Sequence, residues 1–136
     1  MDDVVVNKAA TIERCIRRVH EVYAGRPEHL SNDLTRQDSI VLNLQRACEA
    51  SIDLAMHLVR KHGLGVPQDS RGAFDLLVEA GRLDTDLADA LKAMVGFRNV
   101  AVHDYTRLDL EIVRAIVEGH TDELLAFSSA SLRGEG

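Results

Sequence analysis

Apolar residues recur every three or four positions along most of the chain, which is the spacing of one face of an α-helix. The longest run of this kind lies between residues 35 and 61, where Ile40, Leu44 and Leu58 belong to one apolar face. Gly63 and Pro67 follow it, and these residue types commonly end helices. No segment shows the strict alternation of apolar and polar residues that a half-buried strand requires. The pattern therefore predicts an all-α protein.

Five helical segments follow from this periodicity, with short breaks between them. They span residues 4–24, 35–61, 70–80, 85–102 and a fifth segment that begins near 109 and is divided by Gly119. Asp84 stands where a helix N-cap is expected, because a carboxylate there can accept from free backbone N–H groups. Residues 128–136 are small and polar, and we expect them to form a flexible tail. Short connections between long helices predict an up-and-down bundle in a single domain, residues 1–136.

The composition agrees with a helical domain and excludes several classes of protein. Aromatic residues make up 4% of the chain, Trp is absent and there are two prolines. No run of about 18 apolar residues occurs, so we expect no membrane-spanning segment, and no secretion signal is recognisable. Cys15 and Cys48 lie within helical segments and are expected to be free, buried thiols, which suits the cytoplasm.

The charge of the chain limits how it would contact a nucleic acid. The formal net charge is −6, whereas proteins that neutralise long stretches of nucleic-acid backbone usually present a basic surface. Contact with RNA would therefore be confined to a few arginines in a groove. The same charge also suits a basic protein partner.

The six histidines do not form a recognisable metal site. His57 and His62 are five residues apart, which places them about 140° apart around a helix. No His-x-x-x-His or Cys-x-x-Cys pair occurs, although such spacings are typical of zinc sites. We therefore expect no metal and no cofactor.

Arg98 interrupts the apolar stripe of the segment 85–102. On a helical projection it lies between Leu91 and Met94, about 20° from Leu91 and about 40° from Met94. An arginine cannot be buried without a partner, because desolvation of its charge is too costly. Either it pairs with an acidic residue, or the stripe opens onto a site for an anion such as phosphate. Asn99 and His103, one turn apart, add polar groups that suit the second interpretation.

Glu49 and Asp53 are the acidic residues considered as partners of this site. They are spaced i, i+4 in the segment 35–61 and share a face with Arg46 and Arg60. Such spacing is typical of a solvated face with ion pairs. The alternative is that one of the two carboxylates holds Arg98 or His103 in position.

Arg98 and His103 are five residues apart, so their faces differ by about 140° on a continuous helix. One chain cannot easily close both around one phosphate, whereas two chains related by a two-fold axis can. In such a dimer His103 would take a proton from a ribose 2′-hydroxyl and Arg98 would stabilise the phosphate as charge develops. Asn99 would orient the imidazole. The structural alternative is that Arg98 only pairs with a buried acid near a helix end.

A family resemblance lies in residues 98–105, RNVAVHDY. This stretch resembles the signature of HEPN domains, an arginine followed after a few residues by a histidine, and its His103-x-Tyr105 ending is similar to that of HepT-like toxins. The resemblance implies a two-fold dimer and metal-independent endoribonuclease activity, with the motifs of both chains in one cleft. It also implies an MNT-type nucleotidyltransferase antitoxin as partner, which adenylylates Tyr105 and silences the toxin.

The expected function is therefore that of the toxin in a type VII-like toxin–antitoxin pair. RNA would be the substrate, and a homodimer or a larger hetero-oligomer would be the assembly. On a continued helix Tyr105 would lie about 20° from Arg98, so an AMP group there would occupy the arginines that the substrate needs. One alternative is a non-catalytic helical module that binds a nucleotide or a protein partner through the same cleft. Another is an interaction bundle in which Arg98 is only structural.

Overall fold

The computed structural model describes residues 2–135, and within that range all regular structure is helical. The elements are α1 (Asp3–Tyr23), α2 (Glu28–Ser31), α3 (Leu34–Lys61), α4 (Ser70–Glu79), α5 (Thr85–His103), the 3-10 turn η1 (Tyr105–Arg107), α6 (Leu110–Gly119) and α7 (Thr121–Glu135). The all-α prediction is confirmed.

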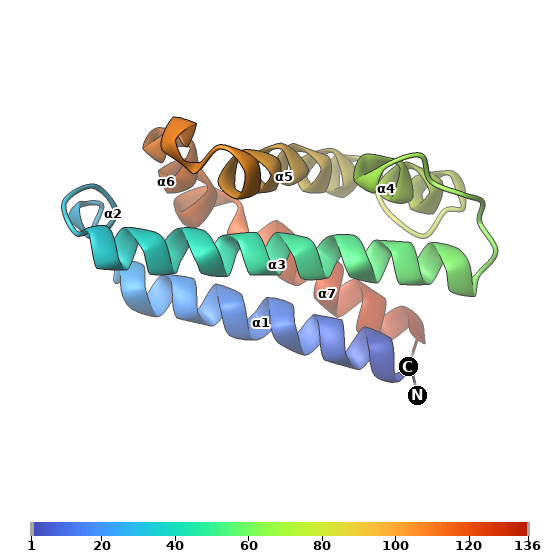
Figure 1. Ribbon diagram of the computed structural model, residues 1–136. Helices are drawn as coiled ribbons and strands as arrows, with labels where there is room; N and C mark the ends of the chain where they lie inside the picture. The colour runs from blue at the N-terminus through green and yellow to red at the C-terminus, as the bar shows by residue number, and fades with distance from the viewer. Residues whose placement is uncertain (1, 136) are drawn as a thin grey trace.

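The two longest helices, α1 and α3, lie side by side and run in opposite directions (Figure 1). Helices α4 and α5 lie along another side of α3, and α7 lies behind, so α3 occupies the centre of the bundle (Figure 1). Ile40, Leu44 and Leu54 of α3 are fully buried, although Leu54 lies off the main apolar face. A central helix buries several faces because neighbours surround it.

The prediction of five helices is too low for the described residues, which form seven α-helices. Helix α2 is a single turn that follows Pro27, and one turn is too short for apolar periodicity to identify. The segment that begins near residue 109 is two separate helices, α6 and α7. The chain breaks between them at Gly119 and His120, the point that Gly119 marks in the sequence.

The prediction of a flexible tail at 128–136 is wrong for the part of the tail that the structure describes, because α7 continues to Glu135. Ser128 and Ser131 are 0% and 6% exposed. The Ser128 hydroxyl donates to the backbone oxygen of Ala9 on α1 over 3.4 Å. Small side chains here allow close packing of α7 on α1. Flexible tails are also rich in small polar residues, so the composition alone predicted a tail. Residue 136 lies outside the described residues.

Aspartates begin several of the helices. Asp33 and Asp69 accept hydrogen bonds from backbone N–H groups in the first turns of α3 and α4, at 3.1 and 2.8 Å. Asp84 occupies the predicted N-cap position of α5, but its side chain accepts no capping hydrogen bond. The caps satisfy backbone donors that a helix leaves unpaired at its start.

The state of the two cysteines agrees with the sequence expectation. Cys15 and Cys48 are buried and free, and burial raises the pKa of the Cys48 thiol to about 12. No helix among residues 2–135 is both long and apolar enough to cross a membrane.

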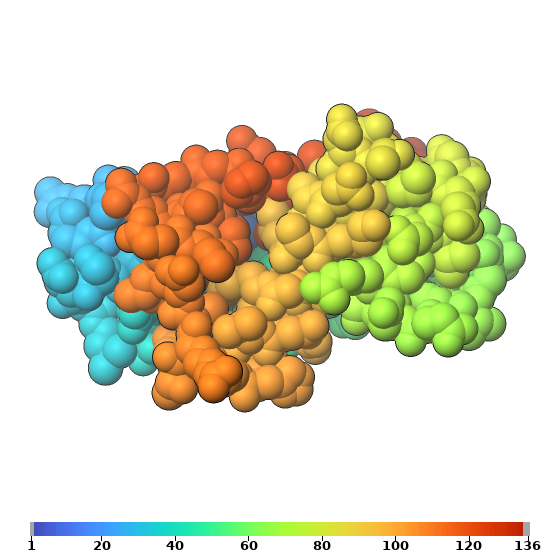
Figure 2. Space-filling model, turned by 90° about the horizontal axis from the view of Figure 1, so that it is seen from above, coloured from blue at the N-terminus to red at the C-terminus, as the bar shows by residue number. Residues whose placement is uncertain are grey.

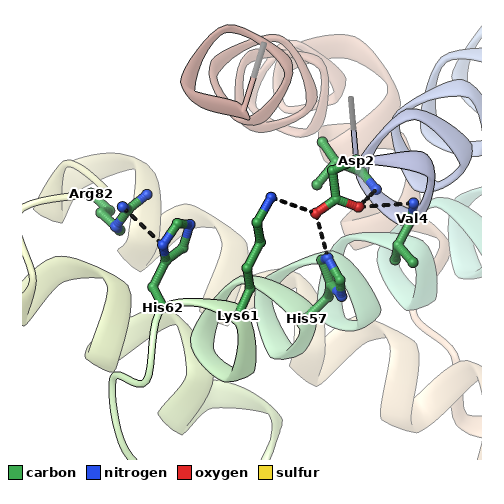
Figure 3. Close-up of polar contacts among 7 residues, drawn as sticks. Asp2, Val4, His57, Lys61, His62 and Arg82 are labelled. Atoms are coloured by element: carbon green, nitrogen blue, oxygen red, sulfur yellow. Dashed lines mark hydrogen bonds and ion pairs between the residues drawn. The ribbon is translucent and has the colours of Figure 1, made fainter.

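Asp2 ties the start of α1 to the end of α3 (Figure 3). One carboxylate oxygen accepts a hydrogen bond from the backbone N–H of Val4 at 3.0 Å, and the other lies 2.9 Å from Lys61 Nζ and 2.7 Å from His57 Nε2. The contacts with Lys61 and then with His57 hold the pKa of Asp2 well below its usual range. The deprotonated carboxylate therefore stabilises the packing of α1 on α3.

We predict that Asp2→Asn lowers the melting temperature near neutral pH. The folded-state pKa of Asp2 is lowered, so its contribution is complete above the unfolded pKa of about 4 and is lost as the pH falls toward the folded value. Thermal unfolding should thus show a larger difference between wild type and variant at about pH 7 than at about pH 3. Asp89→Asn, which changes a carboxylate that is 64% exposed, is the matched control. Equal melting temperatures for wild type and Asp2→Asn near neutral pH would contradict the prediction.

Candidate functional site

Arg98 lies where α5 leaves the core. Leu91, Met94 and Val95, earlier on the same stripe, are buried, whereas Val102, one turn after Arg98, is 41% exposed. The Arg98 side chain is 28% exposed. The guanidinium therefore lies at the border between the apolar interior and solvent, which explains why a cation interrupts the stripe at this position.

Two side chains hold the guanidinium of Arg98. Its Nε lies 3.4 Å from Oε1 of Glu49 on α3, and its Nη1 donates to Oδ1 of the adjacent Asn99 at 3.0 Å. Gln45, one turn before Glu49, donates to the same Glu49 oxygen at 3.3 Å. A guanidinium has five N–H donors, and these contacts occupy two of them. Arg98 is therefore held in place and can still bind an anion.

Of the two acids considered from the sequence, Glu49 reaches Arg98 and Asp53 does not. Asp53 Oδ2 lies 3.1 Å from Lys8 Nζ and links α3 to α1 at the surface. Asn99 contacts Arg98. Among the described residues, the expected contact of Asn99 with the imidazole of His103 is not present within one chain.

His103 is the last residue of α5 and its side chain is exposed. Among the described residues, no hydrogen bond or ion pair joins His103 to another side chain or to the backbone of another segment. Helix α5 is continuous from Thr85 to His103, so the offset of about 140° from Arg98 is retained. One chain therefore presents the guanidinium and the imidazole on different faces of the same helix end.

Tyr105 does not lie on a continuation of α5, so that prediction is wrong. The backbone of Asp104 leaves the helical conformation, with φ −154° and ψ 60°, and Tyr105 begins the turn η1. The Tyr105 residue is 41% exposed, and its hydroxyl donates to Oδ1 of Asp38 on α3 over 2.6 Å. The phenol is thus fixed beside the first turns of α3.

Asp38 also changes the acidity of the phenol. Burial, and after it the hydrogen bond to Asp38 and the charge of that carboxylate, raise the pKa of Tyr105 to about 12. A nearby negative charge disfavours the phenolate, so the hydroxyl keeps its proton at neutral pH. The sequence interpretation did not single out Asp38. It lies about three turns before Glu49 on the same face of α3, and this shared face was the available signal.

An exposed apolar pair accompanies these polar contacts. Leu42 of α3 and Val102 of α5 are each 41% exposed. Leu42 lies on α3 between Asp38 and Glu49. We use the name motif face for the surface of α3 and α5 that carries Leu42, Glu49, Arg98, Asn99 and Val102.

A groove of about 510 Å³ lies on another side of α5, between α5 and α6. The space-filling view shows this side of the molecule, with a hollow between the two helices (Figure 2). Phe97, Val100 and Ile112 are among the apolar residues that line it. Neither Arg98 nor His103 lines this groove, so it is separate from the motif face.

Among residues 2–134, no group of three His, Cys, Asp or Glu side chains is placed to hold a metal ion. The two histidines near the end of α3 have different partners (Figure 3). His57 contacts Asp2, and Nδ1 of His62 lies 3.1 Å from Nη2 of Arg82.

Comparisons with known proteins identify the family of the chain. The family profile described as Ribonuclease HepT-like matches residues 12–131. An mRNA nuclease HepT from Shewanella oneidensis is 49% identical over 127 residues, which are 93% of this chain and 95% of that relative.

Two solved structures are also similar. One is the tri-AMPylated Shewanella oneidensis HEPN toxin in complex with MNT antitoxin, with a TM-score of 0.92 and 47% identity over 98% of this chain and 99% of that chain. The other is a toxin–antitoxin complex with AMP-PNP, with a TM-score of 0.92 and 45% identity over 97% of this chain and 99% of that chain. The chain therefore belongs to the HepT-like ribonuclease family.

Proposed function

We propose that this chain is a metal-independent endoribonuclease and the toxin of a type VII-like toxin–antitoxin pair in the cytoplasm. The observation that carries the proposal is Arg98, held at the edge of the core with donors left for a phosphate, together with the exposed imidazole of His103. Two of the similar proteins, an mRNA nuclease and a HEPN toxin bound to an MNT antitoxin, support the same assignment.

In the proposed reaction His103 is the general base. It takes the proton of a ribose 2′-hydroxyl, and the 2′-oxygen attacks the adjacent phosphorus while the bond to the 5′-oxygen breaks. The departing 5′-oxygen takes a proton from solvent water. The products are a 2′,3′-cyclic phosphate and a 5′-hydroxyl end. Arg98 stabilises the charge that develops on the phosphate oxygens. Asn99 and Glu49 are positioning residues, because each contacts the guanidinium.

The proposed cleft contains residues from two copies of the chain. Arg98 and His103 lie on different faces of one helix end, so a single chain does not bring both to one phosphate. A two-fold dimer through the motif face would place His103 of each chain near Arg98 of the other. The exposed Leu42 and Val102 supply apolar surface for such a contact.

We expect a dimer at micromolar concentration, and we expect Val102→Glu to dissociate it and to reduce RNA cleavage. The substitution would place an unpaired charge in the apolar part of the interface. Light scattering coupled to size exclusion gives the mass, and a cleavage assay gives the activity. Ile112→Glu is the matched control, because Ile112 is 53% exposed but lies at the separate groove. A wild-type monomer that cleaves RNA at full rate would rule out the composite cleft.

We expect His103→Ala and Arg98→Ala each to reduce RNA cleavage by roughly 10²- to 10⁴-fold, the usual contribution of a general base or an electrostatic stabiliser. His120→Ala and Arg18→Ala, which remove an exposed residue of each type, should cleave like wild type. Cleavage should continue in EDTA, since the proposed base is a side chain. The assay would follow formation of the cyclic phosphate. An active His103→Ala protein, or strong inhibition by EDTA, would show that this mechanism is wrong.

We also propose that an MNT-type nucleotidyltransferase silences the toxin by adenylylating Tyr105. Mass spectrometry of the protein after co-expression with such a partner should locate one or more AMP groups on Tyr105. Tyr23, the other tyrosine, is 3% exposed and should stay unmodified. Tyr105→Phe should remain toxic in the presence of the partner. Complete neutralisation of Tyr105→Phe by a catalytically active partner would mean that binding alone is the antidote.

A further inference from the structure

Asp38 contacts the hydroxyl that the proposed function modifies. The two residues are 67 positions apart in sequence, and the Tyr105 hydroxyl donates to Asp38 Oδ1 over 2.6 Å. Both residues are exposed in the isolated chain. The hydroxyl and its acceptor are therefore accessible to a second protein.

The carboxylate of Asp38 has no cationic partner among the described residues, and the Tyr105 hydroxyl is its hydrogen-bond donor. The arginines nearest in sequence to the two residues form ion pairs with other carboxylates. Arg36 pairs with Asp33 at 3.1 Å, and Arg107 pairs with Asp104 at 3.2 Å. Because no cation occupies this carboxylate, its oxygens remain available as hydrogen-bond acceptors. Asp38 is thus placed to receive the proton of Tyr105.

Asp38 also lies on a rigid element. It is in the second turn of α3, a 28-residue helix whose N-terminus is capped by Asp33. The turn that carries Tyr105 is itself held by backbone hydrogen bonds, from Asp104 N–H to Val100 at 2.8 Å and from Arg107 N–H to Asp104 at 3.0 Å. The direction of the phenol is therefore set before any partner binds.

On the basis of the proposed silencing of the toxin, we propose that Asp38 is a positioning residue for adenylylation. Asp38 orients the Tyr105 hydroxyl and accepts its proton. In this step the phenolic oxygen bonds to the α-phosphorus of ATP. The bond from that phosphorus to the bridging oxygen breaks, and pyrophosphate leaves with the electron pair. The phenolic proton passes to Asp38 Oδ1. The toxin thus supplies a base for its own modification.

The acidity of the phenol explains why such an acceptor is needed. With a pKa of about 12, only roughly one phenol in 10⁵ is ionised at neutral pH. An acceptor that is already hydrogen-bonded removes the proton as the new bond forms, so the attack does not wait for free phenolate. Charged or titratable groups close in sequence to these two residues are Arg36 and Asp33, which pair with each other, Asp104 and Arg107, which also pair, and His103 at the end of α5.

The test measures the rate of AMP addition to Tyr105 by intact-protein mass spectrometry. The probe is the MNT antitoxin of the Shewanella oneidensis complex with ATP, at saturating antitoxin so that docking does not limit the rate. Asp38→Asn should slow the reaction about 10²-fold or more near neutral pH, and Asp38→Glu should restore part of the rate because it keeps an acceptor carboxylate. Asp89→Asn, the matched control on α5, should react like wild type.

The pH profile separates proton transfer from a purely structural role. In Asp38→Asn, burial still raises the pKa of Tyr105, but the contribution of the carboxylate is lost. Attack by Asp38→Asn then depends on free phenolate, so its rate should rise steeply between about pH 7 and pH 9. The wild-type rate should change less over that range, because the carboxylate takes the proton. RNA cleavage by unmodified Asp38→Asn should be retained, since Asp38 contacts neither Arg98 nor His103, and it reports on the fold.

Two results would overturn the inference, and they differ in what else they affect. If wild type and Asp38→Asn gain AMP at equal rates across the pH range, Asp38 has no role in the step and the proposed function stands. If wild type itself gains no AMP on Tyr105, the proposed silencing fails and this inference fails with it.

Discussion

The enclosure of α3 by its neighbours is the constraint on which the arrangement of the site depends. Because α3 is packed on several sides, its side chains have fixed places relative to both α1 and α5. Glu49 and Asp38 both come from this helix, and they hold Arg98 and Tyr105 respectively. A helix that could slide or rotate by one residue would separate both pairs, so the central packing determines where the guanidinium and the phenol lie.

The placement of Arg98 also reconciles an acidic protein with the proposed phosphate ligand. The net charge of −6 disfavours broad attraction to nucleic acid. A guanidinium at the edge of the core is less hydrated than one on a mobile surface side chain, and its orientation is set by Glu49 and Asn99. Binding of this kind depends on geometry at one phosphate more than on the overall field of the protein.

The parts of the fold that the sequence predicted are those with local signals. The bounds of α1, α3, α4 and α5 agree with the apolar periodicity to within a residue or two, because aspartates, glycines and Pro67 mark their ends. The prediction of a flexible tail is wrong because it depended on composition. Ser128 and Ser131 are small and polar, and composition does not distinguish a side chain packed against another helix from one in solvent. Burial of that kind depends on contact with residues such as Ala9, more than a hundred positions away.

The same distinction applies to the site. Arg98 stood out because it interrupts an apolar stripe, and Glu49 because it shares a helix face with Asp53. Both patterns can be recognised within a single helix. The end of α5 carries no glycine or proline, so a continued helix was the simplest expectation for Tyr105. Only the tertiary structure brings the phenol to Asp38, because that contact joins two segments whose spacing along the chain contains no information about their distance.

The two ends of the described chain lie together at one end of the bundle, whereas the end of α5 and the turn η1 lie toward the opposite end (Figure 1). A fluorescent protein or an affinity tag fused beyond Asp2 or beyond α7 would therefore stand away from the end of α5 and from η1. Joining the ends with a short linker would also leave every helix in its present order in space. The fold thus separates the ends of the described chain from the end of α5, where the proposed site lies.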